Sequence, residues 1–394
     1  RRVGCVGLGE APDPLPAPRS PVQRPPRRGR GVGRRTGRGV GPRTRRGVGR
    51  PPPCGRRNAA ASRAVQAVRE DDRHSVLARG GGVALRRDFL ASGFDVEDVM
   101  RAVRAGVLVR VRRGAYADAE LWQSMDDRGR HLLTARAVLS ALAPPAALSH
   151  TSAALALGLP VWGVDLSTVH VTRAHAGQSR HEAGVVHHRG VLPASQVVEV
   201  DGLRVTRPDR SVLDLARLAG FEAGVVVADA ALHEGLVTRE ELFALHTSTS
   251  DWPASSVAGR VVRFANALAQ TVGESRTRVL CHNVGLPAPA LQVEVRPRGR
   301  QYFLDLVIEA AMTAIEFDGR LKYRMGDSLD PRTLEAILWA EKRREDDIRS
   351  LGYRVERVAW ADLGRPQTTG ARLWATVRQG LDDVSRGVTA RRPA

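Results

Sequence analysis

Three carboxylates stand inside apolar runs in the last third of the chain. Asp305 lies within Phe303–Ile308, and Glu316 and Asp318 lie within Ala314–Gly319. Burying an acid in an apolar strand is costly, so acids found there often bind a metal or take part in catalysis. The alternative is that these acids stand at strand ends, solvated or paired with arginine. In that case Asp318 and the following glycine form an ordinary turn.

These carboxylates can act together only if the two runs are neighbouring strands. A hairpin centred between Ala310 and Ala311 would place Asp305 directly opposite Glu316. Like charges at facing positions destabilise a sheet, and a cation between them removes that penalty. Mg²⁺, or Mn²⁺ in its place, prefers oxygen ligands, and a metal held by carboxylates can activate water for attack on a phosphodiester. The turn lacks the Asn-Gly pair typical of tight hairpins, so the register rests on the strand pattern.

Two further residues could complete such a site. The chain has only two lysines, and one of them, Lys322, follows the acids closely. A movable ammonium group suits a phosphate or an attacking water, although chance retention explains the lysine equally well. Glu274 is expected at the start of the helix before the strands. The helix dipole alone favours an acid there, and the side chain could also reach a metal.

The elements that would position these side chains can be read from periodicity. The densely charged helix near residues 341–347 is expected to present a solvated face, with Arg344 and Arg349 relieving the repulsion between Glu341 and Glu345. The pattern predicts helices over 274–283, 334–350 and 371–381, and strands over 290–295, 302–308, 312–317 and 353–358.

Near the other end of the folded sequence, three short helical patterns precede a basic hairpin. The helices are expected over 73–78, 85–91 and 96–105, followed by a strand from Leu108 and a return through Gly114 to Tyr116. This order is typical of a winged helix-turn-helix, in which the third helix enters a DNA groove. Arg110, Arg112 and Arg113 would then lie on the wing near phosphates. The alternative is a small helical domain with a solvated basic hairpin, and winged helices also mediate protein contacts.

The region between these two parts alternates helices and short strands. Ser149 is expected to cap the helix that follows it. Five histidines, at positions 170, 175, 181, 187 and 188, have no spacing typical of a metal site, and His187 and His188 should point to opposite strand faces. The pattern predicts helices over 131–142, 153–157, 211–218, 223–232 and 257–268, and strands over 169–172, 185–188 and 203–206.

The net charge of +19 is concentrated at the N-terminus, where residues 1–70 hold 18 arginines against three acids. This Arg/Pro/Gly-rich segment cannot bury enough surface to fold. It is either an arm that grips phosphates or the product of a start site set too far upstream, since the chain opens on Arg1. Three isolated cysteines and the absence of an apolar segment near 18 residues predict a cytoplasmic protein without a membrane contact.

Residues from about Glu274 to Trp360 resemble the PD-(D/E)XK nuclease superfamily, nearest to the very-short-patch-repair-endonuclease-like domains. The matching residues are Glu274, Asp305, Ile315–Gly319, Leu351–Val355 and Arg357. The resemblance implies Mg²⁺-dependent cleavage of DNA, with Asp305 and Glu316 as metal ligands and Glu274 assisting. The family's lysine position is occupied here by Asp318, so Lys322 would have to act from a shifted site.

Residues 71–250 are similar to AbiEi-type antitoxin proteins. The resemblance is carried by Val103–Tyr116 and Leu148–Gly158, with Asp209–Arg217 in support. It implies promoter binding and autoregulation of a toxin operon, with DNA and a cognate toxin as partners, or a role in phage defence.

The expected fold class is multidomain α/β: a winged helix-turn-helix, a small α/β domain and a restriction-endonuclease-like domain with a mixed central sheet. The first functional hypothesis is a metal-dependent DNA endonuclease-like protein guided by its winged helix. The alternative is a non-catalytic AbiEi-type autoregulator with a degenerate nuclease domain, and a weaker one is an antitoxin that acts only through protein contacts. The expected boundaries are a tail over 1–70, domains over 71–125, 126–250 and 273–386, a linking helix over 251–272 and a tail over 387–394.

Overall fold

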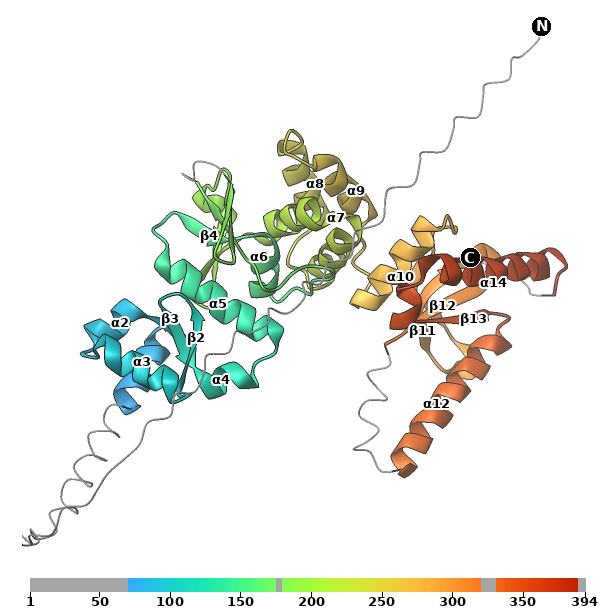
Figure 1. Ribbon diagram of the computed structural model, residues 1–394. Coiled ribbons are helices and arrows are strands. Elements are labelled where there is room, and N and C mark those ends of the chain that lie inside the picture. The colour runs from blue at the N-terminus through green and yellow to red at the C-terminus, as the bar shows by residue number, and fades with distance from the viewer. Residues whose placement is uncertain (1–69, 175–178, 320–330, 389–394) are drawn as a thin grey trace, which may run out of the picture. The chain divides into compact units, whose positions relative to one another are not determined.

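A computed structural model describes residues 70–174, 179–319 and 331–388 (Figure 1). The described residues have a mixed α/β architecture with three sheets, as the sequence predicted. They all fall within one compact unit, Ala60–Ala394. No helix in the described ranges is both long enough and apolar enough to cross a membrane.

The N-terminal region is a winged helix. Its first helix covers residues 70–79, and its three-stranded antiparallel sheet has the order β1-β3-β2. The other elements are β1 (Val83–Leu85), α2 (Arg86–Ala91), α3 (Val96–Arg104), β2 (Leu108–Arg112) and β3 (Ala115–Asp118). The three predicted helices and the hairpin are therefore confirmed, whereas β1 was missed because three residues are too few to show strand alternation.

A small core of aromatic and branched side chains holds this winged helix together. Phe89 of α2 lies edge-on to both Phe94 and Tyr116, with ring centroids 5.8 and 6.2 Å apart. Val99 packs α3 against the same cluster. The opposite, polar face of α3 is therefore the face turned to solvent. Asp95 caps α3 by accepting a hydrogen bond from the Asp98 amide at 2.7 Å.

The middle region is built on a six-stranded mixed sheet with the order β6-β7-β5-β4-β9-β8. The predicted strands β5, β7 and β9 are confirmed, and the shorter β4, β6 and β8 were missed. The bounds are β4 (Ala146–Leu148), β5 (Val169–Arg173), β6 (Arg180–Glu182), β7 (Val185–Arg189), β8 (Val197–Val200) and β9 (Leu203–Thr206).

Helices pack around this sheet and continue beyond it. The two predicted helices after β9 are the two parts of α7, which is interrupted at Gly220 by a left-handed φ of 88°. Ser149 stands at the N-cap of α6 as expected, but its side chain makes no capping bond and instead contacts His150. The helices are α4 (Ala119–Ser124), α5 (Asp127–Ala141), α6 (His150–Ala156), α7 (Pro208–His233), α8 (Arg239–Ser248) and α9 (Ser255–Phe264).

The C-terminal region has a four-stranded sheet with the order β10-β11-β12-β13. The first three strands are antiparallel, and β13 returns parallel to β12 after a helical crossover. The elements are α10 (Val272–Asn283), β10 (Ala290–Val295), β11 (Tyr302–Ile308), β12 (Thr313–Asp318), α12 (Pro331–Ser350), β13 (Arg354–Ala359), α13 (Trp360–Leu363) and α14 (Pro366–Ser385). All seven predicted elements of this region are confirmed, with bounds that differ by up to five residues.

Each face of this sheet is covered by different helices. Leu306 and Ile315 pack with residues of α10 and α14, and Leu304 and Ala314 pack with residues of α12. α10 approaches β12 so closely that a Cβ atom at Gly273 would lie 2.0 Å from the Phe317 ring. The helix that carries Glu274 is therefore fixed against the strand that carries Glu316.

A buried ion pair joins α10 to α7. Arg278 donates through Nη2 to both carboxylate oxygens of Asp229, at 2.7 and 2.6 Å. The same carboxylate accepts from the Ser275 hydroxyl and the Asn266 amide, each at 2.8 Å, and Asp229 has no exposed surface. A buried carboxylate that accepts four hydrogen bonds fixes the two helices relative to each other.

Candidate functional site

The wing is a short hairpin with an irregular register. β2 and β3 are joined through Arg113 and Gly114, and Gly114 takes a left-handed φ of 76° that favours glycine. A bulge between Arg110 and Arg112 breaks the alternation of β2, so these two arginines no longer share one environment. Arg110 and Arg113 are exposed, as a phosphate contact requires.

Arg112 differs from the two exposed wing arginines. It is only half-exposed, and its burial lowers the pKa of its guanidinium, an effect that nearby Glu182 opposes. Its charge is thus partly balanced by an acid of β6. The expectation that Arg110, Arg112 and Arg113 act alike on the wing stays untested, but their surroundings favour Arg110 and Arg113.

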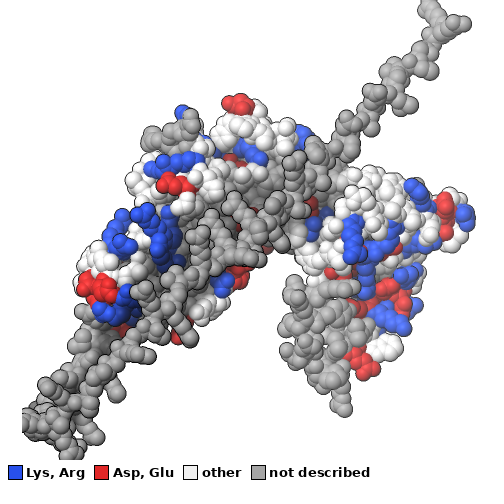
Figure 2. Space-filling model, viewed as in Figure 1, with Lys and Arg blue, Asp and Glu red and all other residues white. Residues whose placement is uncertain are grey.

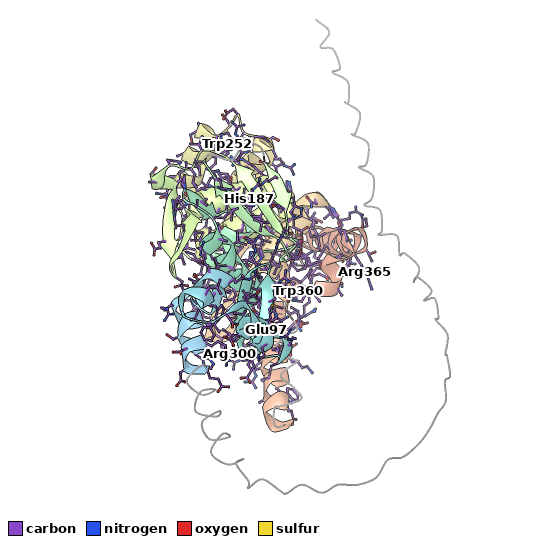
Figure 3. All side chains as sticks on the ribbon, turned by 60° about the vertical axis from the view of Figure 1, so that its left-hand side comes forward. Glu97, His187, Trp252, Arg300, Trp360 and Arg365 are labelled. Atoms are coloured by element: carbon purple, nitrogen blue, oxygen red, sulfur yellow. The ribbon has the colours of Figure 1, made fainter. Side chains whose placement is uncertain are left out.

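The exposed face of α3 carries both signs of charge. Arg101 forms an ion pair with Asp98 at 3.0 Å, and Arg104 forms one with Glu97. Glu97 lies exposed on α3 (Figure 3). Figure 2 shows Lys and Arg side chains gathered over the part of the surface where Figure 1 draws α2, β2 and β3, with a smaller acidic group beside them.

The acidic hairpin has the predicted register. Leu306 faces Ile315, Val307 faces Ala314 and Ile308 faces Thr313. The next facing positions are Asp305 and Glu316, but the backbone ladder ends before them. Asp305 Oδ2 there accepts a hydrogen bond from the Phe317 amide at 3.0 Å. The structure therefore brings Asp305 to Phe317, which stands between the other two acids near the end of β12.

Glu316 is held by an arginine that the sequence reading assigned elsewhere. Arg344 of α12 forms an ion pair with it, Nη1 to Oε2 at 2.8 Å, and donates a hydrogen bond from Nη2 to Oε1 at 3.1 Å. Arg344 was expected to relieve Glu341 and Glu345 on a solvated face; Arg349 lies 2.8 Å from Glu345 as expected, whereas Arg344 binds Glu316. The sequence could not show this, because no local spacing links a helix residue to a strand residue 28 positions away.

Burial raises the pKa of Glu316 to about 7, and the charge of Asp305 adds to that rise while Arg344 opposes it. The side chain lines a cleft of about 240 Å³ between β12, α12 and β13. Asp318, Glu341 and Glu345 also line this cleft, and Arg357, which forms a 2.9 Å ion pair with Glu345, lines it too. The cleft therefore combines acids and bound arginines.

Glu274 is buried beside this group. Its carboxylate accepts from the Gln270 amide at 3.0 Å, the Thr271 hydroxyl at 2.9 Å and the Gln292 side-chain amide at 3.3 Å. Burial raises the pKa of Glu274, and the charge of Asp305 contributes to the same rise. Gln292 was not predicted; it adopts a left-handed φ of 49° within β10, a strained position that sequence alone does not reveal.

The three acidic side chains expected to bind Mg²⁺ or Mn²⁺ already have other partners. Asp305 is bonded to a backbone amide, Glu316 to Arg344, and Glu274 to three donors. Among the residues that the structure describes, no group of three or more His, Cys, Asp or Glu side chains is arranged to hold a metal ion. These side chains do not fit a metal as they stand, and the metal site stays a prediction. Lys322 lies outside the described residues.

The middle region contains a cluster of histidine rings that sequence reading did not anticipate. The His150 and His188 rings stack with centroids 3.7 Å apart, and His170 Nδ1 lies 2.9 Å from His188 Nε2. Burial lowers the pKa of His170 to about 4 and that of His188 to about 3, so both are neutral at pH 7. His187, labelled in Figure 3, is buried apart from this cluster, and His175 lies outside the described ranges.

Comparisons with known proteins bear on the winged helix. Residues 75–117 match a family model described as a transcriptional regulator, AbiEi antitoxin. That range runs from the first helix through α2, α3 and β2 into β3, and it contains all three wing arginines. The match supports the AbiEi resemblance for this part of the chain, and it supplies no support for the nuclease resemblance.

The similar proteins and the similar solved structure carry no description of function. Two Mycobacterium tuberculosis proteins, Uncharacterized protein MT2308 and Uncharacterized protein Rv2248, are each 25% identical over 283 residues, which cover 71% of this chain and 94% of theirs. The crystal structure of RV2827C protein from the same organism has 19% identity and a TM-score of 0.34, covering 48% of this chain and 74% of that one. The chain is thus similar over residues 75–117 to AbiEi-type regulators.

Proposed function

We propose that this protein is a DNA-binding transcriptional regulator of the AbiEi antitoxin kind. The observation that carries the proposal is the AbiEi match over residues 75–117, which coincides with a winged helix bearing exposed Arg110 and Arg113. Autoregulation of its own promoter and a cognate toxin partner belong to the same proposal, by analogy with that family.

The geometry of the winged helix assigns separate roles to its parts. α3 would enter the major groove, and the wing arginines would contact the phosphates beside it. Arg101 and Arg104 already bind acids on the same helix, so they would have to exchange Asp98 and Glu97 for DNA. Arg110 and Arg113 form no ion pair within the described residues, so no bond has to break before they bind phosphate.

The test is binding of the full chain to labelled duplexes from upstream of its own gene, measured by fluorescence anisotropy. The double variant Arg110→Ala/Arg113→Ala removes two phosphate contacts. We expect its affinity to fall roughly 30-fold at 0.15 M salt, because each lost contact lowers the salt slope by about 0.9. Binding that is unchanged in this variant would overturn the wing's role, and absence of any binding by the wild type would overturn the proposal.

A metal-dependent DNA endonuclease is the second candidate. It is favoured by Asp305 and Glu316, which occupy the facing positions directly beyond the paired part of the hairpin, with Glu274 within their electrostatic reach. The order of a helix, three antiparallel strands, a helix and a parallel strand also agrees with the nuclease resemblance. A bound Mg²⁺ or Mn²⁺ would supply an activated water and stabilise charge on the phosphate. Arg344 would have to release Glu316 first.

This candidate is tested with supercoiled plasmid and Mg²⁺ or Mn²⁺. Asp305→Asn and Glu316→Gln are compared with Asp382→Asn, which removes an exposed carboxylate of α14. The nuclease candidate predicts nicking by the wild type and by Asp382→Asn, and none by the two site variants. Equal nicking by all four proteins would identify a contaminant and remove the candidate, as would no nicking by any.

A further inference from the structure

A second basic surface lies between the winged helix and the middle region. A groove of about 340 Å³ is bordered by the end of the first helix, by α5 and by the β8–β9 turn. It is lined by Arg79, Arg136 and Arg204, and no acidic residue lines it. A concave surface with one sign of charge concentrates the electrostatic potential and favours an anionic ligand.

The three groove arginines lack acidic partners. Arg79 donates to the hydroxyls of Ser75 and Ser92, at 2.8 and 3.0 Å, and Arg136 donates to the Asp201 carbonyl at 2.7 Å. The Arg204 side chain makes no hydrogen bond or ion pair within the part of the chain that the structure describes. Neutral partners orient a guanidinium without cancelling its charge, so the groove keeps a threefold positive charge.

Two exposed acids, Glu199 and Asp201, stand near the rim of this groove, and Asp201 binds Arg136 through its backbone carbonyl only. Glu199 of β8 is the cross-strand partner of Arg204, and facing side chains on neighbouring strands approach each other. Glu199 is exposed and forms no ion pair with Arg204 in the described ranges. It is therefore a solvated neighbour that weakens the potential at one edge and leaves the groove basic.

Two hydrogen bonds connect the groove to the wing through α2. Arg86, the first residue of α2, donates its amide to the Gly114 carbonyl at the wing turn, at 2.8 Å. Arg87 donates to the Ser140 carbonyl at 2.5 Å, and Ser140 lines the groove. Both arginines are exposed. Basic side chains thus continue from the wing across the start of α2 to the groove.

We propose that this groove binds the phosphodiester backbone of duplex DNA next to the site that the winged helix contacts. The proposal rests on the proposed DNA-binding function and extends the contacted length beyond the wing. Duplex DNA is favoured over a small phosphate ligand because the basic surface is continuous with the wing. Contacts of this kind fix the orientation of a protein on the duplex and carry no sequence information, so they should matter equally for any sequence.

The experiment measures the salt dependence of DNA binding by the full chain. The probes are a 40-base-pair duplex from upstream of its own gene and a duplex of the same length with shuffled sequence. The groove variant is Arg136→Ala/Arg204→Ala. Its control is Arg263→Ala/Arg386→Ala, which removes two exposed arginines outside the groove and the wing. We expect the slope of log affinity against log salt to fall by about 2 in the groove variant, on both duplexes.

The control variant should keep the wild-type slope. Arg204→Ala alone should lower the slope by about 1, and Arg204→Lys should restore it because only the charge is needed. Arg204 makes no bond that its loss could break, so this single variant tests the groove even if the double variant unfolds. Circular dichroism verifies folding.

The outcomes separate this inference from the proposed function. A groove variant with the wild-type slope overturns the groove, whatever Arg110→Ala/Arg113→Ala does. A lowered slope in the groove variant, together with unchanged binding in the wing variant, supports the groove and overturns the wing's role. Saturable binding of inorganic phosphate that Arg204→Ala abolishes, without any change in the DNA slope, would show a small-anion site and overturn the DNA proposal.

Discussion

The winged-helix region and the C-terminal cleft are both rich in arginine, but their arginines have different partners. Arg110 and Arg113 of the wing form no ion pair within the described residues, and Arg79 binds only hydroxyl groups. In the C-terminal region, Arg344 is bound to Glu316 and Arg357 to Glu345. The net charge of +19 of the whole chain does not distinguish the winged-helix region from the C-terminal cleft. The partner of each guanidinium decides whether it can take an external anion.

This contrast divides the expected effects of substitutions into two kinds. Removing one member of a bound pair should change stability, because a buried charge is left without its counterion. Removing an unpaired arginine should leave stability unchanged and alter DNA affinity and its salt dependence. Four predictions test the division.

The largest effect is expected at the buried ion pair between α7 and α10. Asp229→Ala leaves Arg278 without its carboxylate, and we expect the free energy of unfolding to fall by about 3–5 kcal/mol. Urea denaturation of the variant and the wild type measures this change, with Asp382→Asn as a control for an exposed acid. A loss under about 1 kcal/mol would mean that the burial of this pair does not determine how much the pair contributes to the free energy of unfolding.

The next effect depends on pH and concerns the C-terminal cleft. The Glu316 carboxyl has a pKa of about 7 in the folded protein and about 4.5 when unfolded. Between these values the folded state holds a proton that the unfolded state has released. Stability contributed by Glu316 therefore falls as pH rises from about 4.5 to about 7, by up to about 3 kcal/mol, and then levels off.

Denaturation midpoints from pH 5 to pH 8 check this prediction. Glu316→Gln cannot titrate, so its stability should decline less over the same range. Parallel curves for the two proteins would show that Glu316 ionises normally, with its Arg344 pair compensating for burial.

A smaller effect separates two neighbours on the wing. Arg113→Ala should lower the salt slope of DNA binding by about 1, whereas Arg112→Ala should change it by less than about half of that. The reason is that Arg112 is half-buried near Glu182 and Arg113 is exposed. Anisotropy titrations at several salt concentrations make the comparison, and a larger effect of Arg112→Ala would reverse this assignment.

The success of sequence reasoning differed between local and distant features. The hairpin register around Asp305 and Glu316 was predicted, because alternation and one turn determine which residues face each other. The partner of Glu316 was not, since Arg344 comes from a helix whose packing no local pattern fixes. The bulge in β2 was also missed, and it separated Arg110 from Arg112 despite their regular spacing. Whether the nuclease resemblance extends to activity stays a prediction.

The smallest effect is expected on α3. Glu97→Gln removes an acid from the helix proposed to enter the groove and frees Arg104 from its ion pair. Exposed pairs contribute about 0.2–1 kcal/mol, so we expect affinity for a shuffled duplex to rise by a factor of roughly 1.4 to 5. A decrease in affinity for both the upstream and shuffled duplexes would indicate that Glu97 positions Arg104 for DNA. A decrease confined to the upstream duplex would indicate that Glu97 itself reads a base.

The left-handed backbone at Gln292 has a consequence for how this protein can change over time. Glycine adopts that backbone with less strain, so replacing Gln292 by glycine should keep or increase the stability of the fold. A glycine there would lose the amide that contacts Glu274. Lineages that need only a stable fold should therefore drift to glycine at this position, and those that use the acidic cleft should retain glutamine.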